Sequence, residues 1–213
     1  SAGTSHKRLT LGQWSNCYCV ISGVWEWEEE RARGEEAEEP AMRGILDDVC
    51  LSRNSLATSI SARLARKLSR RDMPRELIEP LIREALSEDQ NILSQIAQDL
   101  IAIVDRDPAC RTPLEPLLFY KGFHAITTYR ISHWLWQHDR TIMALQFQSL
   151  ASEVFAVDIH PAATIGCGIL LDHATSFVVG ETAIIRDNVS ILHEVTLGGT
   201  GKEEGDQIGR AHV

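Results

Sequence analysis

The sequence lacks several features that would mark out particular classes of protein. No apolar run approaches the roughly 20 residues that span a bilayer, and the N-terminus has no apolar core of a secretory signal, although 44% of the 213 residues are hydrophobic. Basic residues are in the minority, since 21 Lys and Arg against 30 Asp and Glu give a net charge of -9. A duplex-DNA partner would need a basic face. We therefore expect no membrane and no nucleic-acid partner, and a cytoplasmic location with organelle targeting left open.

Cysteine is also scarce and shows no metal-binding pattern. The odd number of thiols argues against a disulfide framework, and Cys17-Tyr18-Cys19 lacks the two-residue spacer of a zinc knuckle. We expect reduced thiols in a reducing compartment and no metal site. The five residues are Cys17, Cys19, Cys50, Cys110 and Cys167.

Residues 23–156 have the pattern of an all-α domain. Apolar residues step by four from Leu56 to Leu68, as on one face of a helix. Ser87-Glu-Asp-Gln90 has the composition of a capping box, and Pro80 should kink the preceding helix or shift its start. Further helices are expected over 121–138 and 141–155. Residues 1–22 show no periodicity and read as a disordered leader; an organelle-targeting remnant, a non-native leader and untranslated sequence all stay open.

From Ile159 to Thr200 the apolar period changes to six. Neither a helix, with a period of 3.6, nor a strand, with a period of 2, keeps one residue type at every sixth position. A triangular coil with three six-residue sides has this period. We therefore predict an α+β protein whose all-α N-terminal domain precedes a parallel β-helix over 157–206 that stops after about two coils. The residues that open the seven hexads are Ile159, Ile165, Leu171, Phe177, Ala183, Val189 and Val195.

The two halves together resemble the serine O-acetyltransferases, which are hexapeptide-repeat acyltransferases with a left-handed β-helix. The motifs that match are Arg106-Asp-Pro-Ala109, Lys121-Gly-Phe-His-Ala125, Tyr129-Arg130-Ile131, His133-Trp-Leu-Trp136, Val157-Asp-Ile-His-Pro-Ala-Ala163, Leu171-Asp-His-Ala-Thr175, Val178-Val-Gly-Glu-Thr-Ala183 and Val195-Thr-Leu-Gly-Gly-Thr-Gly-Lys202. The resemblance runs from about Val24 to Asp206. It implies acetyl transfer from acetyl-CoA, as co-substrate, to L-serine for cysteine biosynthesis, with no permanently bound cofactor. It also implies homotrimers that pair into a hexamer, and docking of O-acetylserine sulfhydrylase on a C-terminal tail.

The resemblance assigns roles to individual residues. A serine hydroxyl is a poor nucleophile near neutral pH, so a general base must remove its proton; the matching residue is His173, with Asp158 as the carboxylate that orients it. Asp158 precedes His173 by 15 residues, close to one 18-residue coil, so we expect their side chains to be neighbours on adjacent coils. Asp107 and Asp172 are assigned to the ammonium of the substrate serine. Backbone amides of Gly198, Gly199 and Thr200 are assigned to the oxyanion and to acetyl-CoA, with Gly199 preferred.

Other functions remain open at this stage. The chain could be a hexapeptide-repeat acyltransferase with another acceptor, or a scaffold that lost catalysis and only binds the next enzyme. A β-helix zinc hydratase of the γ carbonic anhydrase type would use three histidines around Zn²⁺. His160, His173 and His193 invite that idea, but no two of these three are separated by four residues, which is the ligand spacing of that class.

The C-terminal end departs from the family pattern. In the family, Gly-Asp is followed by Arg-His-Pro and more coils, whereas Gly205-Asp206 is followed here by Gln207 and Ile208–Val213. That hexapeptide reads as the translation of a common sequencing adapter. We expect residues 207–213 to be a non-native tail, and a chain without the later coils to be inactive.

Overall fold

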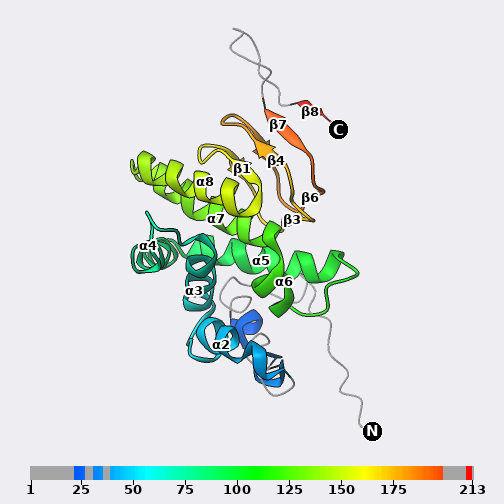
Figure 1. The fold of residues 1–213 in the computed structure, drawn as a ribbon. Helices are drawn as coiled ribbons and strands as arrows, with labels where there is room; N and C mark the ends of the chain where they lie inside the picture. The colour runs from blue at the N-terminus through cyan, green and yellow to red at the C-terminus, as the bar shows by residue number, and fades with distance from the viewer. Residues whose placement is uncertain (1–21, 27–30, 36–38, 199–209, 213) are drawn as a thin grey trace.

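The structure is a computed structural model that describes residues 22–26, 31–35, 39–198 and 210–212. Helices fill one half of the molecule and short strands the other (Figure 1). Residues 22–26 and 31–35 are helical, and they precede a 3-10 turn, a π-helix and seven labelled α-helices. In chain order these are η2 (Pro40–Met42), α2 (Arg43–Leu46), η3 (Asp47–Leu51), α3 (Leu56–Leu68), α4 (Arg75–Glu88), α5 (Gln90–Arg106), α6 (Leu114–Phe119), α7 (Lys121–Gln137) and α8 (Thr141–Phe155). The predicted helical half is confirmed.

Local sequence explains where these helices begin. Ser55 caps α3, because its hydroxyl accepts a hydrogen bond from the backbone N–H of Thr58 at 3.3 Å. The expected capping box at Ser87 is wrong. Asp89 caps α5, accepting from the Asn91 N–H at 2.9 Å, while Ser87 lies in the last turn of α4 and donates to the Glu84 carbonyl. α4 begins at Arg75 and runs through Pro80.

The strands wind into the left-handed parallel β-helix that the hexad pattern predicts. Each strand pairs in parallel with the strand one coil further on: β1 with β4, β4 with β7, β2 with β5, and β3 with β6. Their bounds are β1 (Val157–Ile159), β2 (Thr164–Ile165), β3 (Leu170–Leu171), β4 (Phe177–Val179), β5 (Ile184–Ile185), β6 (Ser190–Ile191) and β7 (Thr196–Gly198). A last strand, β8 (Arg210–His212), pairs antiparallel to β7 and so does not continue the spiral.

The first coil departs from the strict period of six. Ile159 pairs with Val179 rather than with Phe177, and Leu171 pairs with Ile191, so this coil has 20 residues. The next has 18, since Val179 pairs with Leu197. The two extra residues lie between Leu171 and Val179. The hexad frame missed them because alternate residues of a strand point the same way: Val157 and Ile159 are both buried, as are Phe177 and Val179.

The helical half packs on the first coil and also bonds to it. The Tyr129 hydroxyl donates to the Ala163 carbonyl at 2.5 Å and accepts from the Ile165 N–H at 3.2 Å. Arg106 donates to the Gly168 carbonyl at 3.0 Å. These contacts cover the start of the solenoid, as a repeat structure requires. Within the described ranges, none of the helices is both long enough and apolar enough to cross a bilayer.

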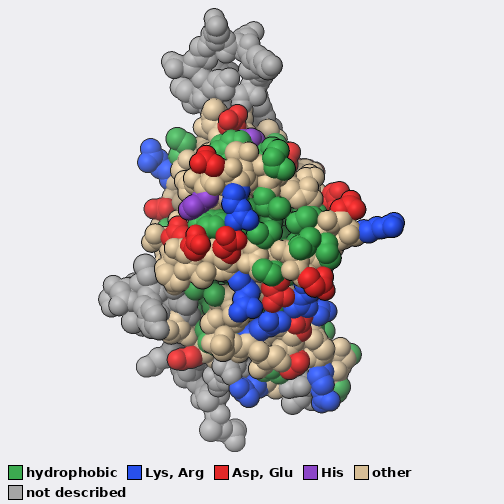
Figure 2. All heavy atoms as spheres, turned by 90° about the vertical axis from the view of Figure 1, so that its left-hand side faces the viewer, with side chains coloured by type: hydrophobic (Ala, Val, Ile, Leu, Met, Phe, Trp, Pro, Cys, Tyr) green, Lys and Arg blue, Asp and Glu red, His purple; other side chains and the backbone are tan. Residues whose placement is uncertain are grey.

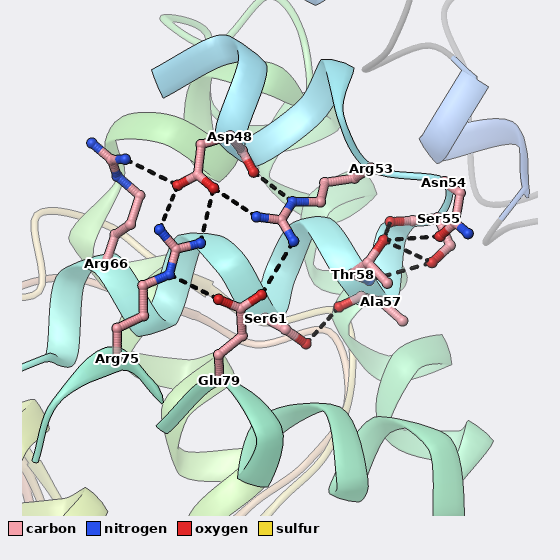
Figure 3. Close-up of polar contacts among 10 residues, drawn as sticks. All are labelled: Asp48, Arg53, Asn54, Ser55, Ala57, Thr58, Ser61, Arg66, Arg75 and Glu79. Atoms are coloured by element: carbon pink, nitrogen blue, oxygen red, sulfur yellow. Dashed lines mark hydrogen bonds and ion pairs between the residues drawn. The ribbon is translucent and has the colours of Figure 1, made fainter. Parts of the chain in front are cut away.

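Charges on the helical half are paired across elements. Asp48 of η3 accepts from Arg53, Arg66 and Arg75 at 2.6 to 2.9 Å, and Glu79 accepts from Arg53 and Arg75 (Figure 3). Arg75 is the largest influence holding the pKa of the Asp48 carboxyl well below its usual range. On the face drawn in Figure 2, acidic and basic side chains lie next to one another, so this face presents no continuous basic surface.

A buried histidine is expected to make the stability of the protein depend on pH. His124 of α7 is 1% exposed, and its Nε2 lies 2.7 Å from the Leu117 carbonyl oxygen. Burial lowers the pKa of His124 from 6.5 to about 3. The unfolded chain therefore binds a proton that the folded chain does not, and we expect the free energy of unfolding to fall by up to ~1.4 kcal/mol per pH unit between 6.5 and 3.

Urea denaturation of wild type and His124→Gln at pH 7.5, 6 and 5 checks this. The variant keeps an N–H donor for Leu117 but does not titrate, so its stability should change less over this range. The exposed His138 supplies the control, and His138→Gln should keep the wild-type pH dependence. Equal slopes for wild type and His124→Gln would contradict the prediction.

Candidate active site

One pocket gathers three of the predicted site residues. It has a volume of about 380 Å³ and lies between the end of α5, the α6–α7 junction and a corner of the first coil. Asp107, Asp172 and His173 all line it, although they come from parts of the chain 65 residues apart. Tyr120 and Lys121 line the same pocket. The pocket thus combines two carboxylates, an imidazole and an ammonium group.

Asp107 both ends a helix and faces the pocket. It is the C-cap of α5, with extended backbone before Pro108, as the sequence predicts. Its carboxylate accepts the Ala109 N–H at 2.8 Å, and its carbonyl accepts the Cys110 N–H at 3.1 Å. This turn fixes the carboxylate at the pocket wall, so the helix-stop role and the site role are compatible.

His173 lies in the corner that contains the two extra residues of the first coil. Three residues of this corner have left-handed backbone, with φ of 57° at His173, 63° at Ala174 and 61° at Ser176. The His173 side chain is 74% exposed, and its Nε2 is 3.7 Å from Oδ1 of Asp172. Its ring meets that of His193 edge-on, with 5.9 Å between centroids. The imidazole is therefore open to an incoming hydroxyl group.

The expected contact between Asp158 and His173 is absent. Asp158 sits in the middle of β1, and its Oδ1 accepts a hydrogen bond from Gln148 at 2.7 Å. Among the residues that the structure describes, no hydrogen bond or ion pair joins the two side chains. Asp158 pairs with Val178, five residues past His173, so the 20-residue coil places the two residues further out of register than an 18-residue coil would. The orienting role of Asp158 stays a prediction.

The oxyanion assignment falls mostly outside the described residues. Gly199 and Thr200 are not among them. Gly198 ends β7, and a Cβ built on neighbouring Gly180 would lie 3.2 Å from the Gly198 Cα, so the two coils approach closely where both residues are glycines. The role of this segment stays a prediction.

The other reactive side chains lie apart from this constellation. His160 packs edge-on against Trp136 at 5.1 Å, and its Nδ1 accepts from the Ala162 N–H. Within the part of the chain that is described, no group of three or more His, Cys, Asp or Glu residues could hold a metal ion. Burial raises the pKa of Cys110 to about 11, so that thiol stays protonated near neutral pH.

Sequence reasoning missed the wall formed by the first turn of α7. Lys121 and Gly122 entered only as part of a matching motif. A Cβ on Gly122 would overlap the carbonyl oxygen of Leu171, the residue just before Asp172. The signal was present, because a glycine in a helix's first turn often marks a close backbone approach.

Comparison with known proteins finds relatives over most of the chain. A family model described as the N-terminal region of serine acetyltransferase matches residues 24–128. A probable serine acetyltransferase of rice (Oryza sativa) is 47% identical over 189 residues, covering 87% of this chain and 60% of that protein.

Solved structures are similar throughout the covered region. A soybean serine acetyltransferase complexed with serine is 47% identical, with a TM-score of 0.85, covering 88% of this chain and 77% of that one. The Brucella abortus enzyme in complex with coenzyme A is 40% identical, with a TM-score of 0.84, covering 86% and 74%. The chain spans 48% to 61% of the length of six rice and Arabidopsis relatives. It belongs to the serine acetyltransferase family.

Proposed function

We propose that the protein transfers the acetyl group of acetyl-CoA to the hydroxyl of L-serine, giving O-acetyl-L-serine for cysteine biosynthesis. The observation that carries the proposal is the pocket in which His173 meets Asp107 and Asp172. The relatives crystallised with serine and with coenzyme A supply the two substrates by analogy. Both substrates arrive and leave in each turnover, so no permanently bound cofactor is invoked.

The reaction follows from the charges in the pocket. The carboxylates of Asp107 and Asp172 attract the ammonium group of serine, which brings its hydroxyl to the exposed imidazole of His173. His173 takes the hydroxyl proton as the oxygen attacks the thioester carbonyl. The tetrahedral intermediate expels the CoA sulfur, which receives that proton from the imidazolium. Direct attack needs no enzyme nucleophile, and we assign the oxyanion to the amides at 198–200.

Assembly and location are further parts of the proposal. We infer a homotrimer formed through the solenoid, pairing into a hexamer through the helical halves. Three exposed apolar side chains on the solenoid, Val178, Ile184 and Leu192, support a subunit contact there. Docking of O-acetylserine sulfhydrylase is expected on the C-terminal tail of such a protein. The reduced thiols of Cys110 and Cys167 are consistent with a reducing, cytoplasmic location.

A thiol-release assay on the protein expressed from its complete reading frame tests the function. With acetyl-CoA, we expect CoA release that depends on L-serine, and O-acetylserine as product by mass spectrometry. Preference for an amino sugar would indicate another acceptor, and no turnover with any acceptor would favour a binding scaffold. Metal analysis of the purified protein is expected to find no stoichiometric zinc, whereas bound Zn²⁺ without serine acetylation would favour the hydratase alternative.

A further inference from the structure

The corner that carries His173 combines a strained backbone with tight internal turns, in which the Ala174 N–H donates to the Asp172 carbonyl at 2.7 Å and the Thr175 N–H to the His173 carbonyl at 2.8 Å. His173, Ala174 and Ser176 all have left-handed φ without being glycine, a conformation that costs about 1 kcal/mol or more per residue. Such a conformation persists only when surrounding contacts over-determine it. The contacts of the corner therefore decide where the imidazole points.

Backbone contacts hold the ends and centre of the corner. Ser176 N–H donates to the Ala156 carbonyl at 2.9 Å, and Glu194 N–H donates to the Thr175 carbonyl at 2.8 Å. Ala174 is fully buried. These bonds tie the corner to the start of β1 and to the next coil, but they leave the pocket side to the first turn of α7.

Lys121, in the first turn of α7, contacts the corner from the pocket side. Its Nζ donates to Oγ1 of Thr175 at 2.5 Å. Among the described residues, this is the only side-chain hydrogen bond that reaches residues 172–176 from outside. Gly122, the next residue, lies so close to Leu171 that a Cβ would overlap its carbonyl oxygen. The first turn of α7 thus contacts the chain both before and after His173.

We propose that Lys121 is a positioning residue for His173, acting through the hydroxyl of Thr175. This rests on the proposed function, in which His173 is the base. Lys121 also lines the pocket, so an ionic contact with the carboxylate of serine is the competing role. The two roles differ in what they change. The orientation of the His173 imidazole matters in the transition state, so losing it lowers kcat. A contact with the serine carboxylate that is equally strong in the ground and transition states would instead affect KM when it is lost.

A double-mutant cycle separates the roles in the complete protein. Lys121→Met removes the ammonium but keeps the aliphatic stem, and Thr175→Val removes the acceptor with little change in volume. We expect each to lower kcat about tenfold with KM for serine within twofold, and the double variant to be no slower than the slower single one. Lys121→Arg keeps a cationic donor and should stay within threefold of wild type. Thr182→Val, at an exposed threonine of the same solenoid, is the matched control and should not change kcat.

Several results would overturn the proposal. One is a raised KM in Lys121→Met together with a silent Thr175→Val, which would assign Lys121 to the substrate carboxylate. Additive losses in the double variant, or single variants with wild-type kcat, would equally reject coupling through Thr175.

A second measurement does not depend on the reaction. Amide hydrogen exchange at residues 173–177 should be several-fold faster in both single variants than in wild type, with exchange in α5 unchanged. If the wild type fails to acetylate serine, the proposed function fails while exchange still decides the positioning role. Unchanged exchange in this corner would reject that role even in an active enzyme.

Discussion

Replacing His173 by glutamine should lower kcat for serine acetylation by about two to four orders of magnitude, the range typical for loss of a general base. Glutamine keeps a polar side chain of similar reach but cannot take the hydroxyl proton. Because the His173 side chain is 74% exposed, the change should leave the folded state almost unaffected. Steady-state kinetics of the complete protein, with circular dichroism to confirm folding, measures both effects.

Two partner variants sharpen this test. His138→Gln, at an exposed histidine at the far end of α7, should keep wild-type kcat. Asp158→Asn tests the orienting assignment, since that carboxylate contacts Gln148 here. A loss of kcat in Asp158→Asn close to that of His173→Gln would support the orienting role of Asp158, and a kcat near that of wild type would exclude this role. If His173→Gln itself retains more than a tenth of wild-type kcat, His173 is not the base.

Replacing Arg130 by methionine should lower the free energy of unfolding by about 3–5 kcal/mol, the usual cost of leaving a buried charge unpaired. Arg130 of α7 and Asp99 of α5 are 2% and 1% exposed, joined by hydrogen bonds of 2.7 to 3.0 Å. Arg130 also donates to the Gly166 carbonyl, and Asp99 accepts from the Ile169 N–H, each at 2.8 Å. Burial raises the pKa of Asp99 while Arg130 opposes the rise, so Asp99 should take up a proton in the variant, which limits the loss.

Urea or guanidinium denaturation near pH 7 measures this loss. The double variant Arg130→Met with Asp99→Leu removes both charges and should recover part of the stability, although Gly166 and Ile169 then lose partners. Arg111→Met, at an exposed arginine, is the control and should change stability by less than about 0.5 kcal/mol. A loss below about 1 kcal/mol for Arg130→Met would show that the pair contributes little.

The architecture could be predicted from the sequence because it depends on repeated burial. A strict repeat of apolar residues marks the walls of a β-helix whatever the identities of the corner residues. The count of residues in one coil could not be predicted in the same way. Inward-facing positions on one strand are two residues apart, and Phe177 and Val179 are both buried. A count by sixes can therefore stop at Phe177 instead of Val179 and still find an apolar residue.

The length of the first coil bears on one expectation about the site, the proximity of Asp158 to His173. The structure brings Asp107, Asp172 and His173, which the family motifs assign to the site, to one pocket, and their individual roles stay predictions. The proximity of Asp158 to His173 was argued from a coil of 18 residues, and the first coil has 20. The buried pair of Asp99 and Arg130 was not predicted, because on an amphipathic helix a charged residue reads as exposed.

The hydrogen bonds between α7 and the first coil affect how the protein unfolds. The change of period at 156–158 suggests two pieces, yet Tyr129 and Arg130 each have backbone partners on the spiral. If the first coil opened, these α7 side chains would lose their acceptors, and the apolar surface beneath the coil would be exposed to water. The helices and the first coil are therefore expected to melt in one cooperative step, and a helical half severed at Ala156 would expose the surface on which the spiral was seated.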